Sequence, residues 1–259
     1  MDSPFADDLA LAMRLADAAS AISMAHFRQS PRQWAKSDGS LVTEADLAVE
    51  HALRALLATE RPNDAILGEE AGASGSGSRR WIIDAIDGTV DFAKGSPHWC
   101  TLIALEIDDY LSVAVCEQPS HRRRYWATRG GGAFRQSESE SEPHRLRVSD
   151  VDTIDGARST VSSDQWLPDD ESRRAAAALR AVTRTAPVLE HPALQVASGG
   201  FEFVVFFLAG PWDLAAPALI VREAGGRFTD LDGRDALDSG NGVFSNGRVH
   251  DEVLRLVAG

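Results

Sequence analysis

Two aspartates with two residues between them stand in the segment WIIDAIDGTVDF, at Trp81 to Phe92. The apolar run that opens this segment predicts a buried strand ending near Asp84, so Asp84 and Asp87 are expected where the chain turns. Closely spaced carboxylates suit a hard cation such as Mg²⁺, and the carbonyl of Ile86 between them adds a further oxygen ligand. The segment therefore predicts a divalent metal site.

Gly88 and Thr89 follow directly after the second aspartate. Glycine permits another group to come close to the backbone, and free N–H groups at the start of a short helix attract phosphate oxygens. A metal site beside such a turn favours phosphate chemistry.

Two further acids stand at predicted chain turns. Glu69 follows a short apolar stretch, and Asp213 opens a predicted helix. A buried acid needs a cation to offset the cost of its desolvation. Singly, each acid is explained as well by a helix cap or a surface charge, so only the joint arrangement of Glu69, Asp84, Asp87 and Asp213 indicates a metal centre.

Periodic apolar residues predict the elements that must position these acids. One helix is expected from Ser3 and Pro4 to about Phe27, and a second begins at TEAD, Thr43 to Asp46, in the form of a capping box. The simplest interpretation of Asp46 alone is therefore a helix-capping acid. Strands are predicted over 100–107, 111–117, 124–128 and from 226, helices over 170–185, 213–223 and 251–257, and a buried segment over 194–208. Their alternation favours an α/β layer arrangement.

Several segments are predicted to be turns or connectors. The polar stretch 33–40 ends in Asp38 and Gly39, a turn signal, and the Gly/Ser-rich stretch 72–78 is expected to form a connector or a lid. The acidic stretch 137–144 predicts a solvated hairpin tip or linker, and we place a boundary after it, giving subdomains 1–145 and 146–259. Pro217 predicts that the helix around it starts late or lacks a donor in its first turn.

Length and composition are those of an ordinary globular protein. With 259 residues, 44% hydrophobic and 25% charged, the chain can form one large domain or two closely packed ones. Its formal net charge of −13 argues against general nucleic-acid binding. The negative charge suits a protein that concentrates divalent cations, although a solvated acidic surface is the simpler explanation.

Neither a membrane segment nor a secretory signal is predicted. The opening MDSPFADD lacks a basic region followed by an apolar core, and no apolar run approaches the roughly 20 residues that span a bilayer. Cys100 and Cys116 lie in apolar runs without the spacing of a zinc site or a disulfide framework, which predicts buried thiols in a reducing compartment. We therefore expect a cytoplasmic protein.

Four segments, taken in order, are similar to the motifs of one known family. AKSDGSLVTEAD at 35–46 matches KxDxSxVTxAD, GEE at 68–70 matches GEE, WIIDAIDGTVDF matches DPIDGTxNF, and WDLAAPALIVREAGG at 212–226 matches WDxAAxxxIxxEAGG. The chain resembles the inositol monophosphatase family from about Lys36 to Asn246. Within that family, RRRYWATRGGGAF resembles the actinobacterial histidinol-phosphate phosphatases.

The resemblance implies an α/β fold, a layered α-β-α-β-α sandwich that forms a homodimer. It also implies hydrolysis of small phosphate monoesters with two or three Mg²⁺ ions, with Mn²⁺ as a possible replacement and inhibition by Li⁺ in many members. Such an enzyme takes a small phosphate ester as its partner, and neither nucleic acid nor a membrane.

Roles pass from the family to the matching positions of this chain. The first metal would be held by Glu69, Asp84 and the carbonyl of Ile86, the second by Asp84, Asp87 and Asp213, and a third, weakly held ion by Glu70. Asp46 and Thr89 would orient the attacking water, with Glu69 counted beside them in the catalytic set. The backbone N–H groups of Gly88 and Thr89 would bind phosphate.

Departures from the family pattern concern mainly the part that recognises the alcohol. In the central motif Ala85 replaces proline and Asp91 replaces asparagine, which leaves the spacing of the acids unchanged. The family's glutamate seven residues before the last aspartate, which contacts a substrate hydroxyl or amine, is Phe206 here. This change predicts an altered specificity, with Glu190 or Glu202 as a substitute, unless Phe206 is a core residue.

Several functions stay open from the sequence. Histidinol phosphate is the first candidate substrate, followed by inositol monophosphate and by a cyclitol or sugar phosphate of a specialised pathway. A nucleotidase for 3′-phosphoadenosine phosphates and a catalytically silent metal-binding homologue are the alternatives, and the intact set of acids disfavours the silent one. His98, His121 and His191 show no serine or cysteine partner spacing, so surface or structural roles are expected for them.

Overall fold

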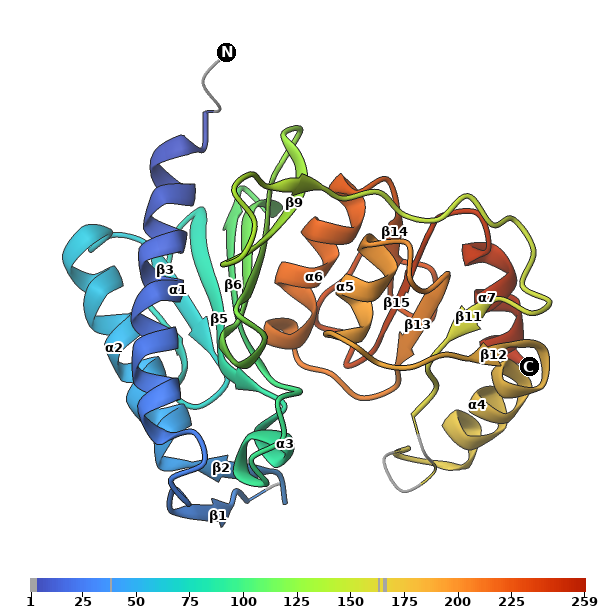
Figure 1. The fold of residues 1–259 in the computed structure, drawn as a ribbon, viewed down its shortest axis with the longest axis horizontal. Coiled ribbons are helices and arrows are strands. Elements are labelled where there is room, and N and C mark those ends of the chain that lie inside the picture. The colour runs from blue at the N-terminus through green and yellow to red at the C-terminus, as the bar shows by residue number, and fades with distance from the viewer. Residues whose placement is uncertain (1–3, 38, 163, 165–166) are drawn as a thin grey trace.

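A computed structural model of the chain describes residues 4–37, 39–162, 164 and 167–259 (Figure 1). Two sequence predictions, the start of the first helix at Ser3 and the turn at Asp38, lie outside these residues. The described chain forms alternating layers of helix, sheet, helix, sheet and helix. The predicted layered α/β sandwich is confirmed.

The elements follow one another as α and β segments along the chain. The helices are α1 (Ala6–His26), α2 (Glu44–Glu60), α3 (Thr89–Ala93), α4 (Asp170–Val182), α5 (Pro192–Ala197), α6 (Pro211–Glu223) and α7 (His250–Ala258), with a 3₁₀ turn at Pro119–His121. The strands are β1 (Gln33–Ala35), β2 (Leu41–Thr43), β3 (Ala65–Gly68), β4 (Gly72–Ser74), β5 (Arg79–Asp87), β6 (Cys100–Ile107), β7 (Tyr110–Gln118), β8 (Arg123–Thr128), β9 (Gly132–Ser137), β10 (His144–Arg145), β11 (Arg158–Ser159), β12 (Arg184–Thr185), β13 (Phe203–Phe206), β14 (Arg227–Thr229) and β15 (Gly242–Ser245).

The larger sheet has the strand order β10-β9-β8-β7-β6-β5-β3-β4. Helices α1 and α2 cover one face of it, and α5 and α6 lie between the other face and the smaller sheet β13-β15-β14 (Figure 1). Successive side chains of β5 point to opposite faces of the sheet, as in any strand. Trp81 and Ile83 pack with α1 and α2, whereas Ile82 packs on the α6 side. Asp84, next in this alternation, therefore belongs to the α6 side.

One hydrophobic cluster joins the two halves of the sequence. Besides Ile82 it contains Leu102 and Cys116 of the larger sheet together with Leu214 of α6 and Phe244 of the smaller sheet. The predicted division at residue 145 stays a prediction, and the residues on either side of it share this core. Both cysteines are buried and free of disulfides, as the sequence predicted.

Several predicted elements are confirmed and some boundaries are corrected. The hairpin of 100–107 and 111–117 is confirmed by β6 and β7. The expected loop over 72–78 is wrong in its first part, because residues 72–74 pair with β3 as strand β4. The expected helix over 170–185 ends at Val182, and residues 184–185 form β12. Pro217 lies inside α6, which starts at Pro211, so the expectation of a late start or a first-turn proline is wrong.

His250 is a buried polar residue that fastens α7 to the smaller sheet. Its Nε2 lies 2.9 Å from Oγ1 of Thr229 in β14, and its Nδ1 lies 2.8 Å from Oγ of Ser245 in β15. Burial lowers the pKa of His250 to about 4 from its ordinary 6.5, so the ring is neutral in the folded protein at pH 7. The neutral ring has one donor and one acceptor nitrogen, which the two hydroxyls can satisfy.

We expect replacement of His250 by leucine to lower the free energy of unfolding at pH 7 by about 2 kcal/mol, because two buried hydroxyls lose a partner. The unfolded chain takes up a proton near pH 6.5 and the folded one only near pH 4, so this residue's contribution is lost as the pH falls through that window. Urea denaturation at pH 7 and pH 5 tests both statements. A variant as stable as the parent at both pH values would contradict them.

No helix among the described residues is long and apolar enough to cross a membrane.

Candidate active site

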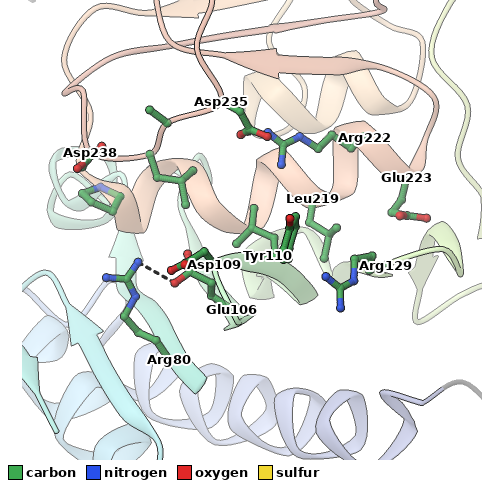
Figure 2. A pocket seen from close by; sticks show the side chains of 14 residues that line it. Arg80, Glu106, Asp109, Tyr110, Arg129, Leu219, Arg222, Glu223, Asp235 and Asp238 are labelled. Atoms are coloured by element: carbon green, nitrogen blue, oxygen red, sulfur yellow. Dashed lines mark hydrogen bonds and ion pairs between the residues drawn. The ribbon is translucent and has the colours of Figure 1, made fainter. Parts of the chain in front are cut away.

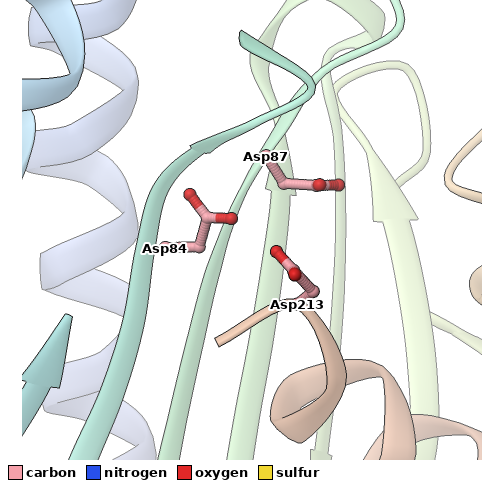
Figure 3. A group of neighbouring side chains, drawn as sticks. All are labelled: Asp84, Asp87 and Asp213. Carbon is pink, nitrogen blue, oxygen red and sulfur yellow. The ribbon is translucent and has the colours of Figure 1, made fainter. Parts of the chain in front are cut away.

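Asp84, Asp87 and Asp213 bring their side chains together at the end of β5 (Figure 3). One carboxylate oxygen of each lies within 4.8 Å of the others. Asp84 and Asp87 come from β5, and Asp213 comes from the first turn of α6. The convergence predicted from the sequence is therefore present for these three acids.

An irregularity in β5 turns its two aspartates to the same side. In a regular strand, residues three apart point to opposite faces of the sheet. Here the register shifts between the pairs Asp84–Leu102 and Asp87–Cys100, as in a β-bulge. Both partners on β6 belong to the cluster on the α6 side, so both aspartates face the helix that carries Asp213.

The start of α6 fixes Asp213. The backbone N–H of Gly210 donates to Oδ2 of Asp213 at 2.6 Å, and Pro211 occupies the first helical turn, where its missing N–H costs nothing. Only one oxygen of Asp213 is used in this way. The other oxygen is available to the cluster.

The cluster carries unfavourable charge. Both carboxylate oxygens of Asp84 are buried without a hydrogen-bond partner among the described residues. Burial, and next repulsion from Glu69, raises the pKa of Asp84 well above its ordinary value. Burial likewise raises the pKa of Asp87 to about 6 and that of Asp213 to about 7. A bound cation reverses such shifts, because it favours the ionised carboxylates.

Lys36, from the segment after β1, reaches the two glutamates of the GEE sequence. Its Nζ lies 2.8 Å from Oε1 of Glu69 and 2.7 Å from Oε1 of Glu70. Burial lowers the pKa of Lys36, but hydrogen bonds with both glutamates outweigh it and raise the pKa. Glu69 lines the same cavity, of about 320 Å³, as Asp84, Asp87 and Asp213, but its carboxylate is not part of their close group.

Glu50 of α2 holds the turn that carries both glutamates. Its carboxylate is 2% exposed and accepts from the backbone N–H groups of Glu70 at 2.8 Å and Ala71 at 3.1 Å. Arg54 neutralises it through Nε at 2.7 Å. A Cβ on Gly68 would lie 2.4 Å from Oε1 of Glu50, so a larger residue there would displace the carboxylate from these N–H groups. Neither Lys36 nor Glu50 was assigned a role from the sequence.

Asp46 has two sets of contacts. Its Oδ2 accepts from the backbone N–H of Thr43 at 2.9 Å, which confirms the capping box of α2. Its Oδ1 lies 3.1 Å from the hydroxyl of Thr89, which also lies 3.1 Å from the carbonyl oxygen of Ile86. The capping acid thus also links α2 to the turn after the cluster.

Gly88 makes this turn possible. Its φ is +86°, and an added Cβ would lie 2.8 Å from the carbonyl oxygen of His98. Both facts require glycine at this position. Thr89 follows as the first residue of α3. Phosphate binding by the N–H groups of Gly88 and Thr89 stays a prediction.

His191 lies beside the cluster, which the sequence did not predict. Its Nε2 is 3.5 Å from Oδ2 of Asp87, and burial lowers its pKa to about 4. Together with Phe206 it lines a cavity of about 280 Å³ that Asp87 and Asp213 also line. The residue precedes α5 and reaches the site only through the packing of that helix, so no local signal marked it.

Glu190 and Glu202, the two glutamates suggested to bind the alcohol part of the substrate, form hydrogen bonds and ion pairs with other residues of the protein. Glu190 contacts the hydroxyl of Tyr125, accepts from Arg123 at 2.9 Å and accepts from the hydroxyl of Ser198 at 2.9 Å. Glu202 is paired with the guanidinium and backbone N–H of Arg158. Glu190 lines a small cavity of about 170 Å³ next to Asp87, so its substrate role stays a prediction.

A cavity of about 470 Å³ lies away from this cluster, beside the start of β5 and the length of α6 (Figure 2). Its cations are largely paired: Arg80 with Glu106 at 2.9 Å, and Arg222 with Asp235. Among the described residues, the group of acids close enough to share a metal ion is the one at the other end of β5. This group offers only carboxylate oxygens as ligands, and both oxygens of Asp84 are buried without a partner among the described residues. Such a set of ligands fits a hard divalent cation.

Comparisons with known proteins agree on one family. The model of the Inositol monophosphatase family matches residues 6–258. A Streptomyces coelicolor protein named Histidinol-phosphatase is 42% identical over 257 residues, 96% of each chain. A Streptomyces griseus protein named Glucose-1-phosphate thymidylyltransferase is 39% identical over 255 residues, again 96% of each. The solved structure of an IMPase from Thermotoga maritima superposes with a TM-score of 0.83 at 29% identity, covering 97% of each chain.

Proposed function

This chain belongs to the inositol monophosphatase family, and we propose that it is a Mg²⁺-dependent phosphomonoesterase acting on a small phosphorylated alcohol. It is a phosphoric monoester hydrolase of a metal-dependent family. The observation that carries the proposal is the carboxylate of Asp84, which is buried, has no hydrogen-bond partner in the described part of the chain and lies close to Asp87 and Asp213. The ionised form of such a group needs a cation to offset its desolvation.

The residues present fit the metal ions that the family uses. Glu69, Asp84 and the carbonyl of Ile86 would hold one ion, Asp84, Asp87 and Asp213 a second, and Glu70 would contribute to a third. Bound Mg²⁺ supplies a water of lowered pKa and neutralises phosphate oxygens. Mn²⁺ offers similar coordination to oxygen ligands.

The chain's own groups orient the reactants. Asp46 and Thr89 would orient the attacking water, and the contact of the Thr89 hydroxyl with Oδ1 of Asp46 supports this role. The N–H groups of Gly88 and Thr89 would bind the phosphate. Lys36 holds Glu69 and Glu70, so it limits the negative charge that meets a phosphate dianion. We assign no covalent nucleophile.

Histidinol phosphate is the first substrate to test, because relatives 42% identical over nearly the whole chain are named Histidinol-phosphatase. Inositol monophosphate is the second. Cyclitol or sugar phosphates and 3′-phosphoadenosine phosphates are the alternatives. A homodimer and a cytoplasmic location stay predictions.

A panel of phosphate esters, with and without Mg²⁺, tests the proposal. It contains histidinol phosphate, inositol 1-phosphate, glucose 1-phosphate and 3′-phosphoadenosine 5′-phosphate, and phosphate release is measured. Glucose 1-phosphate is also incubated with dTTP, because one relative is named a thymidylyltransferase. We expect Mg²⁺-dependent release from at least one ester. No release from any ester would reject the proposal in favour of a silent metal-binding homologue.

A further inference from the structure

We infer that this enzyme selects a phosphate ester whose alcohol presents an apolar or aromatic face, rather than hydroxyl groups, beside the acidic cluster. The inference rests on the proposed phosphatase function and names the class of its substrate. It is carried by a set of side chains that we call the apolar wall: Pro192, Phe206, Leu208 and Ala209.

The apolar wall and two acids of the cluster border one cavity. This cavity, of about 280 Å³, is lined by Asp87 and Asp213 as well as by the wall and by His191. A cavity of about 170 Å³ also borders Asp87, but the cavity of about 280 Å³ is larger and is lined by both Asp87 and Asp213, so we assign the alcohol of a bound phosphate ester to it. The alcohol then meets the apolar wall.

Phe206 is held in place from two sides. Its ring stands edge-to-face with His191 at a centroid distance of 5.7 Å and with Phe244 at 5.3 Å. Its backbone lies in β13, paired with Gly242 of β15. Packed rings in such positions do not swing aside readily. Phe206 therefore forms a fixed part of the apolar wall.

The apolar side chain of Leu208, at the same cavity, is largely exposed to water. Its exposed fraction is 75%, and it lines the cavity together with Phe206. An apolar group of the substrate would cover it and gain from the burial of both surfaces. A hydroxylated ring would gain less and would leave its hydroxyls facing carbon.

Among the described residues that line this cavity, no carboxylate outside the cluster is available to bind a substrate hydroxyl. The acids that line the cavity, Asp87 and Asp213, belong to the cluster. Glu202 is paired with Arg158, and Glu190 with Arg123 and Tyr125. A hydroxyl covered by the ring of Phe206 would lose its hydrogen bonds to water, and hydrophobic pockets reject an added hydroxyl by up to about 100-fold.

The test compares two phosphate esters of alkyl alcohols, 2-phenylethyl phosphate and myo-inositol 1-phosphate, and the change of their ratio between parent and variants cancels the difference in leaving-group basicity. For the full chain with Mg²⁺ we expect kcat/KM to favour 2-phenylethyl phosphate by about tenfold or more. Phe206→Glu and Leu208→Glu should each lower this preference by about tenfold. Leu208→Glu is included because its exposed position tolerates a charge without unfolding the protein.

Leu189→Glu is the matched control. Leu189 is 65% exposed, comparable to Leu208, but does not line the cavity. This variant should keep the preference of the parent, which separates a local effect of the wall from a general effect of added charge.

A preference of the parent for inositol 1-phosphate would overturn the inference, as would an unchanged ratio in Leu208→Glu. If Phe206→Glu lowers both rates equally and also lowers the melting temperature, Phe206 is a core residue and Leu208→Glu alone decides. Absence of phosphate release from every ester by the parent protein would instead reject the proposed function, so the two failures are distinguishable.

Discussion

Replacement of Asp84 by asparagine is expected to abolish metal-dependent phosphate release while leaving the protein folded. Asparagine has nearly the same shape but removes the charge from a carboxylate that is 1% exposed and has no partner among the described residues. Loss of one preorganised charge partner at a reacting centre costs about 10² to 10³ in kcat, and Asp84 would contact both metal ions, so the loss should reach at least that size.

The same substitution should stabilise the metal-free protein, because burial and repulsion raise the pKa of Asp84 and so disfavour its charged form. Phosphate release and thermal unfolding without Mg²⁺ measure the two effects. Asp109→Asn is the matched control, since Asp109 is exposed in the turn between β6 and β7, where a φ of +64° suits asparagine. Full turnover in Asp84→Asn would contradict the proposal that Asp84 holds the metal ions needed for phosphate release.

Stabilisation of the protein by Mg²⁺ should depend strongly on pH. Burial, with repulsion between the acids, raises the pKa of Asp87 to about 6 and that of Asp213 to about 7, from an ordinary 3.8. Without metal, the folded state therefore keeps protons that the unfolded chain has lost, and stability falls as the pH rises from about 4 to about 7. Mg²⁺ pairs with the ionised acids and must compete with these protons.

At a Mg²⁺ concentration about 100 times its dissociation constant at pH 8, the melting temperature should rise by about 5–10 °C. At pH 5.5 the same concentration should give a much smaller rise. Calorimetry at both pH values measures this difference. Asp109→Asn should behave as the parent and Asp84→Asn should lose most of the effect. An equal rise at both pH values would contradict the proton competition.

Local patterns predicted much of this molecule. The capping box at Thr43 and Asp46, the hairpin of β6 and β7 and the helix that carries Asp213 depend on residues close together in the sequence, and the structure confirms them. The convergence of Asp84, Asp87 and Asp213 was expected from the family motifs rather than from periodicity. Asp213 is far along the chain from the other two, so spacing alone does not show that the three meet.

The remaining features depend on packing between distant segments. Regular alternation along β5 would have sent Asp84 and Asp87 to opposite faces, and only the register shift against β6 brings them together. Lys36 follows β1 and contacts Glu69 after β3, and His191 precedes α5 and contacts Asp87 at the end of β5. No pattern within a few residues of Lys36, Glu50 or His191 specifies these contacts.

The position of Asp213 on α6 has a consequence for the order of events during synthesis. The ribosome releases the strand with Asp84 and Asp87 long before α6, and α6 fills the layer between the two sheets. Until that helix has emerged, the nascent chain has an open sheet face and only part of its acidic cluster. The acidic cluster is therefore completed late in synthesis, and an incomplete chain ending before α6 lacks Asp213.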